Sequence, residues 1–220
     1  MLLSGMHKYR LGLEELDAAL DGVSGGSGVL IEGPPASGKQ AIVYAMVRQG
    51  LEDGEGVVLV PTMETGRNAL ASYGDIKNLR IIDCMSRPMG SEEPDSVNVK
   101  HVNGPSDLTG MGVWAARLLD EFREKPVRLC IDSLSTLLMY SSLQVIFRFV
   151  HLMNGRLQES GGLSIGVVDE GMHDEKTMAS LRQLYRGTLE IRETDIASQV
   201  RAVGLSPRPT PWFTFEEVIE

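Results

Sequence analysis

Short apolar runs alternate with segments of helical pattern along most of the chain. Runs that fit buried parallel strands occupy residues 29–31, 57–60, 79–82, 127–131 and 163–168. Apolar residues at helical spacing predict helices over residues 9–20, 41–47, 107–124 and about 142–159. Strands that alternate with helices in this way predict an α/β fold built on a mostly parallel central sheet.

The pattern changes in the last part of the chain. Residues 188–192, 199–205 and 212–215 alternate apolar and polar positions, with turn residues between them, and predict an antiparallel extension of the sheet. Residues 85–105 are rich in Pro, Gly, Ser and acidic side chains, so we expect an irregular surface connection and the best candidate for a mobile region. The helix over 142–159 is apolar on more than one side. Core packing explains most of these apolar residues, and a subunit interface is the alternative location for the remaining ones.

Composition narrows the class of protein. With 220 residues, 42% of them hydrophobic, the chain is long enough for one packed domain, which we expect to span residues 1–220. No stretch resembles a signal peptide or a membrane span, so we expect a cytoplasmic protein without membrane insertion. Cys84 and Cys130 lie in apolar runs without metal-ligand spacing and fit reduced core thiols. The net charge of -9 argues against nucleic-acid binding.

One segment carries the clearest chemistry. The run Gly33-Pro34-Pro35-Ala36-Ser37-Gly38-Lys39-Gln40 matches the phosphate-binding pattern G-x-x-x-x-G-K-[ST] except at its last position. It follows a predicted strand and opens a predicted helix, which is the context that the pattern requires. The glycines let backbone N–H groups turn toward a phosphate, and the lysine reaches the outer phosphates. We therefore predict that these residues bind ATP or ADP.

The exception concerns the metal. Gln40 stands where a Ser or Thr hydroxyl normally ligates Mg²⁺, and it offers a longer amide oxygen in its place. We expect Mg²⁺ binding through Gln40 to be weakened or altered, and hydrolysis to be less secure than nucleotide binding.

Two carboxylates follow predicted strands. Asp132 ends the strand at residues 127–131, where a carboxylate can orient Mg²⁺ and its waters, although a capping or turn role is the alternative. Glu64 follows the strand at residues 57–60 and is the candidate catalytic base for an attacking water, against the alternative of a solvated loop glutamate. Ligands gather at the carboxyl ends of strands in open α/β sheets, which favours the functional interpretation of both.

A third acidic segment runs from Asp169 to Glu175 and also holds a histidine. Its composition invites a metal-site interpretation, but helix-capping acids for residues 175–185 explain it better. Contact of Met172 and His173 with nucleotide or with an adjacent subunit stays open.

The chain resembles the KaiC-like, or circadian clock protein type, branch of the RecA superfamily of ATPases. The resemblance rests on residues 12–17, the loop from Gly33 to Lys39, the segments 60–64 and 130–135, and the closing run 208–215. It implies a three-layer RecA-like fold, ATP bound at the boundary between subunits of a homo-oligomer, hexameric in the family, and slow hydrolysis. Members resembling this chain serve as timers, signal transducers or motor accessories, and the sequence alone does not identify the protein partner.

Departures from the family pattern matter as much as the matches. The family commonly has two consecutive acids where this chain has Glu64 followed by Thr65. It also places a Lys and an Arg near the C-terminus that reach the neighbouring subunit's phosphates, and these positions correspond to Ser206 and Arg208. Together with Gln40, these differences imply feeble turnover by a nucleotide-sensing protein.

Three hypotheses follow. The leading one is a KaiC-like ATP-binding protein with weak or regulated ATPase activity, in signalling or as a ring-forming accessory ATPase. The second is a recombinase-like paralogue that binds DNA, which the acidic balance of the chain disfavours. The third is a pseudo-ATPase that serves as a structural ring subunit, which Gln40 favours and the presence of Lys39, Asp132 and Glu64 disfavours.

Overall fold

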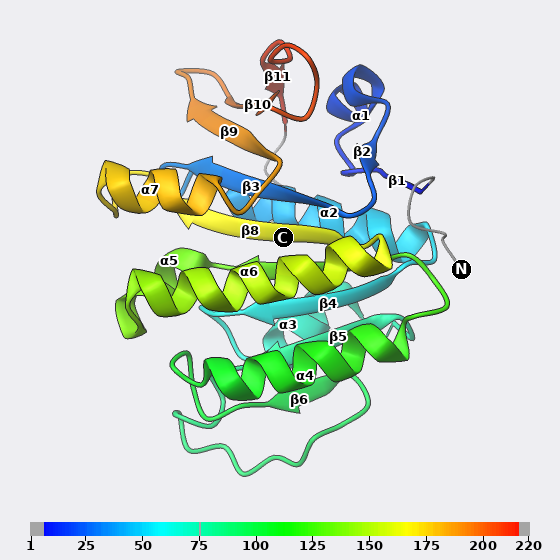
Figure 1. Ribbon diagram of the computed structural model, residues 1–220, viewed down its shortest axis with the longest axis vertical. Helices are drawn as coiled ribbons and strands as arrows, with labels where there is room; N and C mark the ends of the chain where they lie inside the picture. Colours follow the sequence, from blue (N-terminus) through cyan, green and yellow to red (C-terminus); the bar gives the residue numbers. More distant parts are fainter. Residues whose placement is uncertain (1–6, 75, 216–220) are drawn as a thin grey trace.

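A nine-stranded sheet divides the molecule into two layers of helices (Figure 1). The computed structural model describes residues 7–74 and 76–215. The strands lie in the order β11 (Phe213–Thr214), β10 (Ser198–Val203), β9 (Gly187–Glu193), β3 (Ser27–Gly33), β8 (Leu163–Asp169), β7 (Val127–Asp132), β4 (Gly56–Pro61), β5 (Leu79–Asp83) and β6 (Val99–His101). Every neighbouring pair from β9 to β6 is parallel, whereas β10 and β11 pair antiparallel.

This architecture confirms the predicted α/β fold with its mostly parallel sheet and antiparallel extension. One detail differs, because the segment expected to begin the extension forms β9, which pairs parallel with β3 on one side and antiparallel with β10 on the other. A separate two-stranded ribbon joins β1 (Lys8–Tyr9) to β2 (Val23–Ser24).

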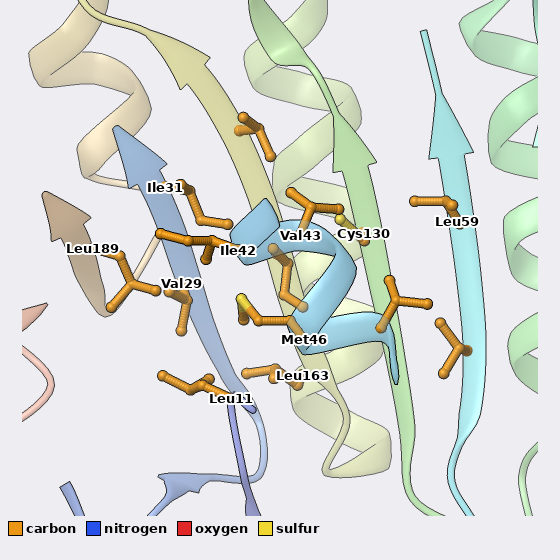
Figure 2. Packing of buried hydrophobic residues seen from close by; sticks show 14 of the residues in the cluster. Leu11, Val29, Ile31, Ile42, Val43, Met46, Leu59, Cys130, Leu163 and Leu189 are labelled. Carbon is orange, nitrogen blue, oxygen red and sulfur yellow. The ribbon is translucent and has the colours of Figure 1, made fainter. Parts of the chain in front are cut away.

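Helices cover both faces of the sheet. The three helices that pack into one core cluster are α1 (Glu14–Leu20), α2 (Lys39–Glu52) and α3 (Gly66–Tyr73). The four that pack into the other are α4 (Leu108–Glu121), α5 (Leu134–Tyr140), α6 (Leu143–Ser160) and α7 (Glu175–Arg182). Successive strand residues point to opposite faces, so Val29 and Ile31 pack against α2, as Figure 2 shows, whereas Leu30 joins the other cluster.

The first predicted helix is shorter than residues 9–20. The Asp17 carboxylate accepts hydrogen bonds from the backbone N–H groups of Leu11 and Gly12, at 2.6 and 2.8 Å. These bonds fold the preceding chain back on the helix, and Gly12 adopts a φ of 79° that favours glycine. The helix therefore begins only at Glu14.

Besides the ribbon of β1 and β2, three short elements were not predicted. Two of them are the helices α3 and α5, and the third is β6, an edge strand inside the segment expected to be irregular. The rest of that segment has no helix or strand in the structure, as predicted. Each of these elements depends on distant contacts: the backbone N–H of Gly66, which begins α3, donates to the Asp83 carboxylate at 2.6 Å.

A fully buried ion pair joins β7 to the residue before β4 and to the helix α2. The Arg128 guanidinium on β7 forms two hydrogen bonds to the Glu55 carboxylate, at 2.6 and 2.7 Å, and another to the carbonyl oxygen of Met46. A Cβ added to Gly50 would lie 2.4 Å from Arg128 Nε, so the helix α2 needs glycine at this crossing. Removing one partner of such a pair costs several kcal/mol, about 3–5, because a buried charge is left without compensation.

Candidate functional site

Four strand ends meet at one edge of the sheet. The parallel register places Gly33 of β3 beside Asp169 of β8, and Pro61 of β4 beside Asp132 of β7. The predicted phosphate loop and the predicted metal-binding carboxylate therefore lie at the same edge. In open α/β sheets this carboxyl edge is where ligands bind.

The loop between β3 and α2 has the geometry of a phosphate cradle. Gly38 begins α2 with a φ of 77°, and Ala36 adopts a positive φ of 59°. A Cβ on Gly33 would lie 2.9 Å from Ser37 Oγ and 2.8 Å from Ile191 Cβ, so only glycine fits there. The first N–H groups of α2 have no acceptors within the helix and carry its positive dipole end. The loop is thus shaped to receive an anion.

Lys39 is the one charged residue between Gly33 and Gln40, and 1% of its side chain is exposed. Its ammonium lies 2.9 Å from the Asp169 carboxylate and donates to the carbonyl oxygens of Gly33, at 3.0 Å, and Pro34. The charge is therefore held at the loop by one carboxylate and two dipoles. The sequence identified Lys39 but not Asp169 as its partner.

The hydroxyl of Ser135 on α5 contacts both the end of β8 and the loop that follows it. The backbone N–H of Asp169 donates to Ser135 Oγ at 2.9 Å, and His173 Nε2 lies 2.9 Å from the same oxygen. Asp174 caps α7 by accepting from the N–H of Thr177, which confirms the predicted capping role for this acidic segment. His173 thus contacts the site edge through Ser135.

Asp132 lies close to two other acids. Burial raises the pKa of Asp132 to about 6, and the negative charges of Asp169 and Glu64 add to this, while Lys39 opposes it. Partial burial also raises the pKa of Glu64, although its side chain remains open to solvent. The site therefore concentrates negative charge that a bound cation would relieve.

Two cavities share Gln40 and Asp132. One, of about 240 Å³, lies between α2 and α3 and is lined by Glu64 and by the stacked rings of Tyr44 and Tyr73, whose centroids are 5.1 Å apart. The other, of about 580 Å³, is lined by residues that include Lys39, Ser135 and Asp169. Gln40 is exposed between them, so its amide has room to face either cavity.

The remaining predicted positions have local roles. Thr65, at the place of the second family acid, caps α3 by accepting from the N–H of Asn68. Ser206 Oγ donates to the carbonyl oxygen of Arg208 at 2.6 Å. Arg208 itself is exposed in the connection between β10 and β11, and within the described part of the chain it lines neither cavity.

The residues present fit a phosphate-containing ligand. The Ser37 hydroxyl is buried in the loop and has no hydrogen-bond partner within the described residues. Lys39 supplies positive charge beside it, and the α2 N-terminus supplies N–H donors. In residues 7–74 and 76–215 no three His, Cys, Asp or Glu side chains are arranged to hold a metal ion by themselves. A Mg²⁺ ion here would need ligand oxygens from phosphate besides Asp132.

The strand order and the helices on both faces define a RecA-like fold, with the loop from Gly33 to Gln40 at the carboxyl edge of its sheet. A solved KaiC-like protein from Pyrococcus horikoshii OT3 is similar to the chain with a TM-score of 0.61 at 18% identity, over 90% of this chain and 87% of that one. An uncharacterised protein from Pyrococcus horikoshii, solved in complex with an unknown peptide, has a TM-score of 0.69 at 14% identity, over 89% and 90%. These similarities show the fold.

The chain belongs to the family described as a family of unknown function, DUF7504, whose model matches residues 26–191. That span runs from the start of β3 to β9 and includes the whole phosphate loop, Glu64, Asp132 and Asp169. No curated protein matches the chain. Among the described residues, no helix is both long and apolar enough to cross a membrane.

The raised pKa of Asp132 predicts a pH-dependent gain from Asp132→Asn in the protein without nucleotide. Between its ordinary value of 3.8 and about 6, the native state binds the extra proton, so native stability falls as pH rises through this window. The amide in the Asp132→Asn variant does not titrate, so the variant does not lose this stability as pH rises. We expect the free energy of unfolding at pH 7.5 to rise by about 1–3 kcal/mol relative to the parent, with no difference near pH 4.

Urea denaturation at pH 4, 5, 6 and 7.5 measures this effect. Asp120→Asn, a change at an exposed position on α4, is the matched control and should leave the free energy of unfolding unchanged at every pH. A stability difference for Asp132→Asn that is the same at every pH would contradict the electrostatic explanation.

Proposed function

We propose that the chain is a KaiC-like nucleotide-binding protein that binds ATP and ADP as one domain and hydrolyses ATP weakly or under regulation. The observation that carries this proposal is the buried ammonium of Lys39, held by Asp169 and by the carbonyl oxygens of its own loop. Burial of this ammonium is costly, and it lies beside N–H groups of α2 that have no acceptor within the helix. An anion bound to those N–H groups would take over part of the contacts of the ammonium, which gives the buried charge a function.

The chain's own residues have distinct parts in this proposal. Lys39 exchanges its contact with Asp169 for an outer phosphate, and the loop N–H groups with Ser37 hold the remaining oxygens. Asp132 supplies a carboxylate for Mg²⁺, which when bound offsets the charge of the phosphates and the acids. Glu64 accepts a proton from an attacking water, helped by its raised pKa.

Weak hydrolysis follows from what the loop lacks. Gln40 cannot place a hydroxyl on Mg²⁺, and its exposed side chain has conformational freedom that a short Thr would not have. The proposed output is therefore a change of assembly or partner binding on nucleotide exchange, in signalling or as an accessory ring ATPase. The peptide in the complex of the Pyrococcus horikoshii neighbour is consistent with a partner-binding role for this fold.

Assembly enters the proposal through Arg208. Pro207 and Pro209 flank it, and all three residues are exposed, so the side chain projects away from its own subunit. We place it against the phosphates bound by a neighbouring subunit of a homo-oligomer, where it would act as an arginine finger does. A hexameric ring is the assembly that the KaiC-like resemblance implies.

Loss of the loop ammonium should weaken nucleotide binding strongly. We expect Lys39→Ala to weaken ATP and ADP binding at least about 100-fold, equivalent to about 2.7 kcal/mol, because a desolvated charge pair is lost. Isothermal titration calorimetry measures it, with circular dichroism to confirm folding and the exposed Lys176→Ala as control. ATP binding by Lys39→Ala within threefold of the parent would place the site elsewhere.

Restoring the missing hydroxyl should restore turnover. We expect Gln40→Thr to raise the ATPase kcat by at least about tenfold, or about 1.4 kcal/mol, and to steepen its dependence on Mg²⁺ concentration. A phosphate-release assay over a Mg²⁺ series measures both quantities. Gln40→Ala separates the gain of a hydroxyl from the loss of an amide. Equal turnover in the Thr variant and the parent would show that Gln40 is not the limiting feature.

Loss of the trans contact should weaken assembly and any residual hydrolysis but leave the folding of the monomer intact. We expect Arg208→Ala to reduce ATP-dependent oligomers in sedimentation velocity while leaving the monomer's melting temperature unchanged, because the residue packs on nothing in its own core. Arg123→Ala, another exposed arginine, is the control. An oligomer distribution identical to that of the parent would remove Arg208 from the site.

A further inference from the structure

A groove on the helical layer opposite α2 has no role in nucleotide binding. The helices α4 and α6 lie side by side on this face (Figure 1), and between them is a cavity of about 650 Å³ that we call the α4/α6 groove. Its lining on α6 extends from Val145 to Arg156, which is about 16 Å of helix at 1.5 Å per residue. The groove is as long as two to three turns of another helix.

The α4/α6 groove is apolar at its base and along its rim. Phe149 and Met153 are buried beneath it, while Val113, Val145 and Leu152 line it with about half of each side chain exposed. Apolar rim residues on two adjacent helices form a continuous surface, and such surfaces mark interaction sites when they are large.

Three arginines surround this apolar surface. Arg117 on α4 and Arg148 and Arg156 on α6 line the groove, and among the described lining residues there is no carboxylate. None of the three forms an ion pair with a described carboxylate, although Asp120 and Glu159 each follow an arginine by three positions. Arg117 instead lies over the ring of Trp114, 5.2 Å from its centroid.

The position of these three arginines is what distinguishes them. Among the described residues eight arginines pair with a carboxylate and seven do not, but Arg117, Arg148 and Arg156 lie together around one apolar surface of a chain whose net charge is -9. A local cluster of three free guanidinium groups against this acidic background creates a positive potential over an apolar surface. An occupant with apolar residues on one side and carboxylates along its flanks would complement both features.

We propose that the α4/α6 groove binds an acidic amphipathic helix of a partner protein. Apolar side chains at positions i, i+4 and i+7 of that helix lie between α4 and α6, and its flanking Glu and Asp side chains pair with the three arginines. The guanidinium groups can bind carboxylates with two hydrogen bonds each, which fixes orientation as well as charge.

Gly112 allows this site to be closed without damage to the fold. It lies in the groove on α4, and a Cβ added there would be 3.8 Å from Phe149 Cε2, an ordinary contact. Gly155 on α6 is a matched control, because a Cβ there would meet no atom within 4 Å and the residue does not line the groove. Both glycines are inside helices, so Met at either position should favour the helix.

The test uses two designed 15-residue helical peptides labelled with fluorescein. Both carry leucines at i, i+4, i+7 and i+11; one has glutamates on its flanks and the other lysines. We expect saturable micromolar binding of the glutamate peptide in fluorescence anisotropy, and at least about tenfold weaker binding of the lysine peptide. Gly112→Met and the double variant Arg148→Glu, Arg156→Glu should weaken binding at least about tenfold, and Gly155→Met should leave it within twofold.

Several results would overturn the proposal. The glutamate peptide could fail to saturate the protein, the two peptides could bind equally well, or Gly112→Met could bind the glutamate peptide as tightly as the parent does. Co-sedimentation of the protein with phosphatidylglycerol vesicles would assign the groove to a membrane surface if Gly112→Met abolished it and the peptide did not compete with it. Self-association that Gly112→Met abolishes would assign it to a second copy. Lys39→Ala should bind the peptide normally, so failure of the nucleotide site is distinguished from failure of this one.

Discussion

The charge of Lys39 must be compensated inside the protein, and the arrangement of the candidate site follows from that requirement. An isolated ammonium with 1% of its side chain exposed would be strongly destabilising. The structure compensates it with Asp169 and with carbonyl oxygens of the loop, which requires β3 and β8 to be parallel neighbours in register. The loop conformation and the β3–β8 pairing are therefore both required for this compensation.

The charge of Lys39 does not fully offset the negative charges of the neighbouring acids. Asp169 pairs with Lys39, but its negative charge also acts on Asp132. The pKa of Asp132 remains raised because burial and the charges of Asp169 and Glu64 outweigh the effect of Lys39. The site without ligand thus holds excess negative charge. Its charge balance favours a ligand that brings a divalent cation together with phosphate, since phosphate satisfies Lys39 and the loop while the cation satisfies the acids.

Acids at strand ends do not all have the same part in this fold. Asp83 ends β5 and accepts hydrogen bonds from the backbone of Gly66, Met85 and Ser86; although burial acts in the opposite direction, these bonds keep its pKa below the ordinary value. Asp132 ends β7 and remains without such donors. The same sequence pattern, an apolar run followed by Asp, therefore gives a structural anchor in one strand and a candidate ligand in another.

The central elements were predictable because their signals are local. Strands buried on both faces appear as apolar runs, and the long helices carry their own periodicity and stop signals. The helices α3 and α5 and the strand β6 were missed because each is short and is stabilised by groups distant in sequence. The N-cap of α5 illustrates this. The Ser133 hydroxyl accepts from the backbone N–H of Thr136, but the backbone N–H of Ser133 donates to the hydroxyl of Thr62, which directly follows β4.

The loop from Gly33 to Gln40, Asp132 and Glu64 could be predicted as candidate site residues because their patterns are encoded in contiguous residues. The pairing of Asp169 with Lys39 was not predicted, because it depends on the strand order, which no local pattern records. Arg128 and Glu55 were missed for the same reason. The α4/α6 groove shows the limit most clearly: the sequence revealed surplus apolar residues on α6, but only the packing of α4 beside it collects these residues and three arginines into one surface.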